Sequence, residues 1–525
     1  MRVLIFHGYL LEGTGSNVYN ARLAEAMAGL GHDVHLLSQD RHAAERPFVD
    51  AVGDWDGGEL RLSDLGRARP AGRGRCTVYR PDIAGLLPVY VLDRYEGVQA
   101  CTFARCSDEE IARYVRCNVA AVQEVARLAD PEAALANHLV MGPAIVARAL
   151  DERVPYAVKI HGSALEYTVK PEPERFLPYA REGLARAGGI LVGSRHTAES
   201  LWETLADETV AARTRLGPPG VDVERFSPRS PAPAAQGVRE LAQTLAAQEG
   251  TGGRSEDAFT RDPAVAARAL GRLEPERDRL VVFVGKLIVS KGIDLLLAAW
   301  PLVMEREPRA RLVVVGFGAY REGLERLCAA LAAGRIDDAI EVARLGRALE
   351  AAISEPRPLR HLLAFLEGLD GDARARYVQA AAALEERVVF TGRLEHDELS
   401  ELLPACEAMV VPSTFPEAFG MVAAEAAACG VLPVSAAHSG LAEVSGVLAR
   451  ALPREAARLL AFPVDDGAVS AIAERLGAWL TAGERLREQT RAGLVSTVRE
   501  HWSWAGVARG ALAAARGELA GLQLP

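Results

Sequence analysis

Short apolar runs alternate along the chain with longer amphipathic stretches, and this alternation predicts parallel α/β sheets. The runs are apolar at almost every position, as expected for strands covered by helices on both faces. In the first half they are RVLIF, DVHLLS, YAVKI and GILVGS, and in the second half RLVVFVG, ARLVVVG, RVVFTG, AMVVPS and VLPVSA. After the first run, Val18, Ala21, Leu23 and Met27 recur at helical spacing, and Gly31 is expected to end that helix.

Two sets of strands in a chain of 525 residues predict two doubly wound domains. We place an N-terminal Rossmann-like domain at 1–226 and a C-terminal domain at 280–504. The stretch between them, 227–279, begins with a segment rich in Pro, Gly, Gln and Ala that is typical of a linker or an inserted excursion. Residues 505–525 are expected to form a helix that crosses back to the first domain.

A second irregular stretch, from about 334 to 383, is rich in Ala, Leu, Arg and Glu and separates two predicted strands of the second domain. Its helical propensity predicts an inserted helical hairpin. We expect this insert at a rim of the domain, where it contacts an acceptor, a partner subunit or only solvent. A surface ornament without a function of its own is the open alternative.

Composition and charge narrow the functional classes. The net charge of −10 and the pI near 5.7 argue against a general nucleic-acid binder. No apolar run reaches the length of a membrane span, and the N-terminal run lacks the cleavage pattern of a signal peptide. The seven cysteines, with Cys101, Cys106 and Cys117 as the nearest to a cluster, contain no CxxC pair and are expected to be free thiols. Together these features predict a cytoplasmic enzyme, with peripheral membrane association left open.

Glycine-rich turns follow two of the predicted strands, at the sheet edge where parallel α/β proteins bind ligands. The first, EGTGSNVY, contains Gly13 and Gly15 ahead of a helix. It departs from the dinucleotide fingerprint GxGxxG because Val18 stands at the sixth position. The second contains Gly316 and Gly318 and is equally unspecific. Either turn can approach a ligand closely or serve as an ordinary tight turn.

Two lysines, Lys286 and Lys291, flank a short loop after the strand RLVVFVG, and a helix is expected to start near Ile293. Ammonium groups beside the amides of a helix terminus are suited to binding a diphosphate. The alternative is that both lysines are solvated loop residues.

The stretch STFPEAFGMVAAEAAACG follows the apolar run AMVVP and is expected to start a helix near Glu417. Because Gly420 has no Cβ, the amides of Phe419, Gly420 and Met421 can lie against a ligand at the positive end of that helix. Glu417, in the first turn, suits sugar hydroxyls. Glu425, two turns further on, can reach another part of one elongated ligand, such as a ribose. The alternative is that Glu417 complements the helix dipole and Glu425 faces solvent.

Four blocks, three of them in the second half, carry a resemblance to a known family. They are PPGVDVERFSP, FVGKLIVSKGIDLLLAAW, VVVGFGAYREGLERL and the long block from VVFTGRL to SGLAEV, in which the E-x7-E spacing of PEAFGMVAAEA is the most specific feature. This half resembles the donor domain of retaining, nucleotide-sugar-dependent glycosyltransferases of the GT-B fold. That large, family-4-like group includes sucrose and sucrose-phosphate synthases and bacterial mannosyl- and glucosyltransferases. With EGTGSNVY and KIHGSALEY, the resemblance spans most of the chain except the linker and the insert.

The resemblance implies two Rossmann-like domains that face a cleft, and it assigns roles in the second domain. Glu417 is expected to bind a hydroxyl of the transferred sugar, and Glu425 to hold the ribose. The amides of residues 419–421 are expected to contact sugar or phosphate. Lys286 and Lys291 are expected to neutralise the diphosphate. The family usually has arginine where Lys286 stands, and lysine keeps the charge but loses the bidentate fork.

For the remaining positions the resemblance implies three further roles. Gly13 and Gly15 are expected to let the first-domain loop close over the diphosphate, and Arg393, in TGRL, to lie near the base. His161, at the end of YAVKI, matches a histidine that touches the donor sugar. The alternative for His161 is a hydrogen-bonded structural histidine.

The expected reaction is transfer of a hexose from a UDP- or GDP-sugar to an unidentified acceptor hydroxyl of a small molecule, glycan or lipid. No carboxylate is an obvious covalent nucleophile, so retention is expected to proceed on one face, with the departing phosphate oxygen taking the acceptor proton. Asp54 and Asp56 fit the Asp-x-Asp pattern of metal-dependent glycosyltransferases, but they lie outside the four blocks and are expected to form a turn. We expect no metal ion and no cofactor.

Three alternatives stay open. A nucleotide-sugar epimerase on the same fold lacks an acceptor site, and a non-catalytic nucleotide-sugar-binding protein leaves its ligand unchanged. A nicotinamide oxidoreductase depends on the two glycine turns, neither of which has the full dinucleotide fingerprint.

Overall fold

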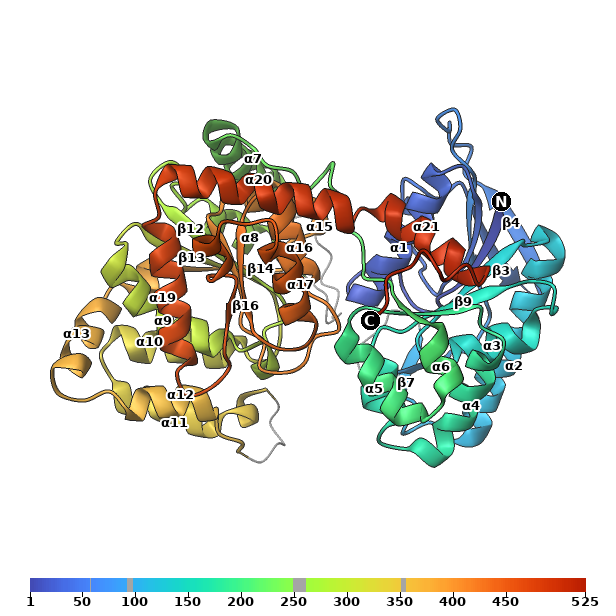
Figure 1. Cartoon of the computed structure of the whole chain (residues 1–525), viewed down its shortest axis with the longest axis horizontal. Coiled ribbons are helices and arrows are strands. Elements are labelled where there is room, and N and C mark those ends of the chain that lie inside the picture. The colour runs from blue at the N-terminus through green and yellow to red at the C-terminus, as the bar shows by residue number, and fades with distance from the viewer. Residues whose placement is uncertain (57, 92–97, 249–260, 351–355) are drawn as a thin grey trace. The chain divides into compact units, whose positions relative to one another are not determined.

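The chain folds into two compact units. The computed structural model describes residues 1–56, 58–91, 98–248, 261–350 and 356–525. The first unit consists of Met1–Gly220 together with Trp502–Pro525, and the second is the continuous stretch Val221–His501. In Figure 1 the first unit therefore contains both the blue start of the chain and its red end. The boundaries predicted from the sequence, after 226 and after 504, lie close to these positions.

The first unit is built on a nine-stranded sheet of order β11-β10-β9-β8-β1-β2-β5-β3-β4. Its strands are β1 (Arg2–Phe6), β2 (Asp33–Leu37), β3 (Ala51–Asp56), β4 (Glu59–Asp64), β5 (Cys76–Arg80), β8 (Ala133–Asn137), β9 (Tyr156–Lys159), β10 (Gly189–Val192) and β11 (Thr214–Leu216). Neighbouring strands are parallel except for the antiparallel pair β3 and β4. A separate parallel pair is formed by β6 (Leu86–Val89) and β7 (Gln99–Thr102).

Helices cover both faces of this sheet. They are α1 (Gly15–Gly29), α2 (Asp108–Ala129), α3 (Gly142–Ala149), α4 (Pro173–Ala185), α5 (Arg195–Leu205), α6 (Glu208–Arg213) and α21 (Trp504–Ala515). Alternate residues of β1 enter two different cores, because successive side chains of a strand point to opposite faces. Leu4 and Phe6 pack with residues of α2 and α3, whereas Val3 and Ile5 pack with residues of α1 and α21, including Trp504.

Helix α1 forms where the apolar spacing predicts it. Ala21, Leu23 and Met27 are buried, and Val18 is half-buried. Gly31, just past the end of the helix, has a φ of +86°, a left-handed conformation that glycine adopts without strain. Figure 1 shows α21 beside α1, with which it packs.

The second unit is built on a six-stranded, all-parallel sheet of order β14-β13-β12-β15-β16-β17. Its strands are β12 (Arg279–Val284), β13 (Ala310–Val315), β14 (Val388–Gly392), β15 (Ala408–Val411), β16 (Leu432–Ala436) and β17 (Ala461–Phe462). Its principal helices are α7 (Pro231–Ala247), α8 (Pro263–Leu270), α9 (Ile293–Arg306), α10 (Arg321–Ala332), α15 (His396–Leu402), α16 (Met421–Ala428), α17 (Ser439–Ala449), α19 (Ala468–Leu480) and α20 (Glu484–His501). Every apolar run that the sequence analysis named forms a strand, and the predicted doubly wound α/β class is confirmed.

The stretch 227–279, predicted as a linker or an inserted excursion, is largely helical where the structure describes it. Helices α7 and α8 pack on each other, and α7 also packs on α15. Arg229, just before α7, forms an ion pair with Glu401 of α15. This part of the chain is therefore folded into the second unit, and 249–260 lie outside the described residues.

The insert is helical as predicted, but where the structure describes it, it forms three helices rather than a hairpin of two: α11 (Ile336–Leu345), α12 (Arg360–Glu367) and α13 (Gly371–Ala381). They pack on α10, α9 and α19 of the same unit, and the Tyr377 hydroxyl donates a hydrogen bond of 2.8 Å to the Ala298 carbonyl. Figure 1 shows α11 and α12 side by side at one edge of this unit. The described insert is thus anchored on the second unit's own helices. Residues 351–355, within the predicted insert, lie outside the described part.

The Asp-x-Asp sequence was expected in a turn, and that expectation is wrong. Asp54 and Asp56 lie at the end of β3, where Asp54 pairs with Arg80 and Asp56 with Arg61. Pairing of β3 with both β4 and β5 fixes this segment as a strand despite its polar sequence. Among the described helices, none combines the length and apolarity that crossing a bilayer requires.

Gly316 lies where the loops after β12 and β13 meet, and alanine at this position is expected to destabilise the second unit. An added Cβ would lie 1.9 Å from the Gly285 carbonyl oxygen, so the backbone itself must move. We expect Gly316→Ala to lower the free energy of unfolding by roughly 1–3 kcal/mol, measured by thermal unfolding. The control is Gly446→Ala, at an exposed position of α17 with open space around it. It is expected to be neutral or stabilising by up to about 1 kcal/mol. Equal melting temperatures for the two variants would contradict the prediction.

Candidate functional site

The loops after β12 and β15 meet at the carboxyl edge of the second sheet, because these two strands are parallel neighbours. The Thr414 amide donates a hydrogen bond of 2.9 Å to the Ser290 carbonyl. Gly292 has a φ of +64°, and a Cβ there would lie 2.0 Å from the Pro412 carbonyl oxygen. The two loops therefore form one surface at the edge where parallel α/β sheets bind ligands.

Lys291 and Glu417, two residues singled out in the sequence, are in contact on this surface. The Lys291 ammonium donates a hydrogen bond to Glu417 Oε1, and the Ser413 hydroxyl donates to the same oxygen at 2.6 Å. Both side chains of the ion pair are partly exposed, at 30% and 25%, so a ligand can reach them. Lys286 lies in the same loop as Lys291, just after β12, and is half-buried. Lys291 and Glu417 thus lie together on the accessible part of this surface.

Helix α16 starts at Met421 with Gly420 as its N-cap, later than the predicted start near Glu417. The reason is that the backbone of Glu417 makes its hydrogen bonds outside α16, with the first residues of α17. Its amide donates to the Ser439 hydroxyl at 2.9 Å, and its carbonyl accepts from the Gly440 amide at 2.9 Å. Glu417 therefore lies outside the first turn, which contains no acidic residue. The alternative of helix-dipole complementation by Glu417 is wrong.

Gly420 was predicted to let backbone amides approach a ligand, and the structure adds a packing reason for glycine at this position. A Cβ on Gly420 would lie 2.8 Å from Cδ2 of Leu441 in α17. The backbone of Phe419, Gly420 and Met421 forms the N-terminal end of α16, where helices present amides with a partial positive charge. Contact of these amides with a ligand stays a prediction.

Glu425 does not face solvent, so that alternative is also wrong. Its side chain is 4% exposed, and its Oε1 lies 3.0 Å from Nε2 of His396, the first residue of α15. Arg393, in the connection between β14 and α15, pairs with Glu395 at 3.0 Å. Arg393 thus lies just before α15, and His396 at the start of that helix supplies the partner of Glu425.

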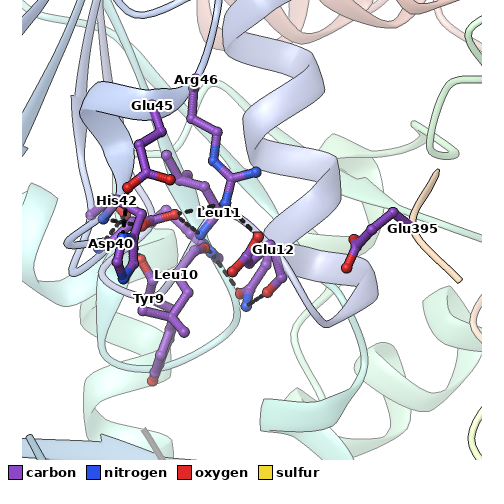
Figure 2. A network of polar contacts seen from close by, with 12 residues as sticks. Tyr9, Leu10, Leu11, Glu12, Asp40, His42, Glu45, Arg46 and Glu395 are labelled. Carbon is purple, nitrogen blue, oxygen red and sulfur yellow. Dashed lines mark hydrogen bonds and ion pairs between the residues drawn. The ribbon is translucent and has the colours of Figure 1, made fainter. Parts of the chain in front are cut away.

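The glycine loop of the first unit is held by a polar network, shown in Figure 2. Asp40, after β2, accepts hydrogen bonds from the Leu11 amide at 3.1 Å and the His42 amide at 2.8 Å. The Arg46 guanidinium lies 2.7 Å from Glu12 and 3.4 Å from Asp40. The loop after β1 is thereby tied to the loop after β2.

Gly13 and Gly15 lie at the end of this loop. Gly13 has a φ of +88°, in the left-handed region that favours glycine. Gly15 is the first residue of α1, and its N-cap, Thr14, makes no side-chain capping bond. The conformation accounts for glycine at position 13, and a role of either residue in donor binding stays a prediction.

His161 belongs to a group of histidines at the carboxyl ends of β1, β8 and β9. Its Nε2 lies 2.9 Å from Oδ1 of Asn137, and its ring lies edge-on to Tyr19 with centroids 5.1 Å apart. The ring centroid of His138 lies 4.9 Å from that of His161 and 5.9 Å from that of His7. His161 is itself half-buried, so both the predicted ligand contact and a structural role remain compatible with its position.

Burial keeps these histidines neutral. It lowers the pKa of His7 to about 4, and it lowers the pKa values of His138 and His161 well below the usual value. Burial also lowers the pKa of the nearby Lys159 to about 7, and this ammonium donates to the Gly217 carbonyl at 2.5 Å. At neutral pH the three imidazoles are therefore neutral rings rather than cations. His7 and His161 make hydrogen bonds to asparagine side chains, whereas neither ring nitrogen of His138 has a hydrogen-bond partner among the described residues.

Sequence reasoning did not single out His7, His138 or His396. His7 directly follows RVLIF just as His161 directly follows YAVKI, so the same rule of polar residues at strand ends could have found it. His138 follows β8, whose sequence AALAN gives no strand signal. For His396, its position three residues after Arg393 was the available hint.

The cysteines give no sign of a disulfide or of a metal centre. All seven are free thiols. Within the ranges that the structure describes, no group of three or more His, Cys, Asp or Glu residues could hold a metal ion.

Two family models match the chain, one in each unit. The model "Glycosyl transferase 4-like domain" matches residues 14–211. The model "Glycosyl transferases group 1" matches 271–335 and 360–492, and so includes Lys286, Lys291 and both glutamates of the E-x7-E spacing. Residues 336–359, within the helical insert, fall outside the match.

Curated relatives match over part of their length. A D-inositol 3-phosphate glycosyltransferase of Salinispora tropica is 29% identical over 300 residues, which are 55% of this chain and 46% of the relative. A sulfoquinovosyl transferase of Arabidopsis thaliana is 27% identical over 45% of this chain and 28% of its own length. The matched regions thus span less than half of these relatives.

Solved structures match over nearly the whole chain. Sucrose-phosphate synthase from Thermosynechococcus elongatus aligns with a TM-score of 0.54 at 19% identity, covering 97% of this chain and 96% of that one. Anabaena HepE in complex with UDP-glucose aligns with a TM-score of 0.54 at 15% identity, covering 99% and 100%. At these identities the likeness establishes a shared fold.

Proposed function

Since the chain belongs to the family-4-like glycosyltransferases of the GT-B fold, we propose that it transfers a hexose from a nucleoside-diphosphate sugar to an acceptor hydroxyl, with retention of configuration. One observation carries the proposal. Lys291 and Glu417 come from two separate loops and meet beside the N-terminus of α16, on a partly exposed surface. A cation for a phosphate and a carboxylate for a sugar hydroxyl are thus side by side.

The second unit is proposed to bind the donor. Lys286 and Lys291 neutralise the negative charge that develops on the diphosphate as the glycosidic bond breaks, and the amides of 419–421 add to that stabilisation. Glu417 accepts a hydrogen bond from a hydroxyl of the transferred sugar. Arg393 lies near the base, and Glu425 binds the ribose.

The first unit is proposed to supply the glycine loop and His161. A neutral imidazole can donate or accept a hydrogen bond with a sugar hydroxyl without adding charge beside the oxocarbenium-like sugar. The departing phosphate oxygen takes the acceptor proton, so bond formation and bond breaking occur on one face of the sugar. Because two lysines supply the positive charge, we propose that the reaction needs no divalent metal and proceeds unchanged in EDTA.

The donor is proposed to carry uridine or guanosine. A solved protein of the same fold is described in complex with UDP-glucose, and a curated relative is named as GDP-mannose-dependent. Relatives named for inositol phosphate or phosphatidylinositol make D-inositol 3-phosphate a first acceptor to assay. We place the reaction in the cytoplasm, in keeping with seven free thiols, with peripheral membrane association if the acceptor is a lipid.

A panel of UDP, GDP, UDP-glucose, GDP-mannose and NAD tests the proposal. Ligands that bind only the folded protein raise its melting temperature, by an amount that depends on ligand concentration relative to Kd. We expect one nucleoside diphosphate and its sugar to raise the melting temperature, and slow release of nucleoside diphosphate and free sugar on incubation. Sugar isomers without nucleotide release would identify an epimerase, and an unchanged bound donor a binding protein. No shift with any uridine or guanosine diphosphate compound would overturn the proposal.

A further inference from the structure

Glu425 is a buried carboxylate among the small side chains of α16. Its side chain is 4% exposed, and its neighbours in α16 are alanines that are themselves buried. A buried carboxylate is costly unless a donor compensates it. The imidazole of His396 lies beside it, with Nε2 3.0 Å from Glu425 Oε1.

His396 is itself fixed in place. Phe226, which is fully buried, contacts the imidazole edge-on, with centroids 5.0 Å apart and planes at 87°. His396 begins α15, and a capping box between Glu395 and Glu398 holds that helix start. These contacts hold the ring with Nε2 beside the carboxylate of Glu425.

The helix that carries His396 is also tied to the segment that carries Phe226. Arg225 forms an ion pair with Asp397, and Arg229 forms one with Glu401. On the 222–229 segment the two arginines stand on either side of Phe226 in sequence. The segment from 222 to 229, near the start of the second unit, thus supports the helix start that carries the imidazole.

We propose that His396 is a positioning residue that holds Glu425 in the orientation in which it binds the ribose hydroxyls of the donor. This inference rests on the proposed function. A carboxylate has two oxygens and about four lone-pair sites, so a bond from the imidazole to Oε1 leaves capacity for two vicinal hydroxyls. The imidazole fixes the rotamer of Glu425 and partly offsets the cost of its burial before the donor arrives.

The test compares two ligands that differ only in the ribose hydroxyls. Binding of UDP and of 2′,3′-dideoxyuridine 5′-diphosphate is measured by titration calorimetry, or of the guanosine pair if GDP is the preferred nucleotide. Wild-type protein is expected to prefer the nucleotide with both hydroxyls. His396→Leu is expected to weaken UDP binding roughly 10-fold while leaving the dideoxy ligand unchanged. The ribose preference is then lost.

Two further variants separate positioning from packing. His396→Gln keeps an N–H donor of similar reach and is expected to recover most of the ribose preference. His396→Asn keeps a polar group that is too short to reach Glu425 and is expected to behave like His396→Leu. Melting temperatures confirm that each variant is folded, and if the leucine variant fails to fold, the asparagine and glutamine pair answers the same question.

The outcomes separate the two claims. An equal loss of affinity for both ligands, or an unchanged ribose preference in His396→Leu and His396→Asn, overturns the positioning role and leaves the proposed function standing. Wild-type protein that binds neither UDP nor GDP overturns the proposed function, and this inference with it.

Discussion

Replacing Glu417 with alanine is expected to abolish sugar transfer while nucleotide binding survives. The carboxylate accepts hydrogen bonds from Lys291 and from the Ser413 hydroxyl, and both donors hold it facing the surface beside α16. In the proposed function it binds a hydroxyl of the transferred sugar, a contact that the nucleotide does not share. Loss of one such preorganised group typically reduces kcat by about 10²–10³-fold. In the same proposal the nucleoside diphosphate is bound by the lysines and the helix terminus, so its affinity is expected to survive the substitution.

The measurement pairs nucleoside diphosphate release from UDP-glucose and GDP-mannose with the affinity for UDP and GDP. Glu417→Gln keeps the size of the side chain and removes its charge, and it is expected to lose turnover nearly as severely. Glu474→Gln, at an exposed position of α19, makes the same chemical change away from the site and is expected to be silent. Unchanged turnover in Glu417→Ala would refute the role assigned to this carboxylate.

Replacing Lys291 with methionine is expected to weaken UDP or GDP binding by about 10–100-fold, because a charge-assisted contact with the diphosphate is lost. The chain contains only four lysines among its 60 basic residues, and two of them, Lys286 and Lys291, flank this one loop. Arginine fills almost every other cationic position. Two lysines in one loop are therefore unusual for this sequence, as expected where a compact point charge is needed.

The readout that isolates the phosphate contact is a comparison of UDP with uridine. Lys291→Met and Lys286→Met are expected to lower the affinity for UDP but not for the uncharged nucleoside, and the difference is expected to shrink as salt rises. Lys170→Met is the control, because Lys170 pairs with Glu166 in the first unit. If both loop variants bind UDP as wild type does, the proposed diphosphate site is wrong.

The sequence predicts the strands that are rich in branched apolar residues and the loops that follow them. It does not predict β8, because AALAN has little intrinsic strand preference and becomes a strand through burial between β1 and β9. The start of α16 was placed too early for a similar reason. The backbone of Glu417 makes hydrogen bonds with Ser439 and Gly440 and so does not join the helix. Both partners follow Glu417 by more than 20 positions in the sequence, and a local pattern cannot show that they are close to it.

In the candidate site, too, local sequence patterns predict some features, and others depend on how distant segments pack. The sequence pattern places Lys291 and Glu417 each in a loop at a strand end. Their direct contact depends on β12 and β15 being neighbours in the sheet, which the pattern does not give. The pairing of Glu425 with His396 depends on how α15 packs near α16, and no local pattern encodes that packing. The histidines at the ends of β1 and β8 come together with His161 only through the order of strands in the sheet.

The division of the first unit into two stretches has a consequence during synthesis. Val3 and Ile5 lie in a core that is completed by residues of α21, such as Trp504 and Leu512. A ribosome must therefore translate the whole of 221–501 before that face of the first sheet can be covered. The nascent chain carries an open apolar surface throughout this interval, of the kind that chaperones bind. A premature stop near 501 would leave that surface uncovered for good, and such a product is expected to aggregate even though its second unit is complete.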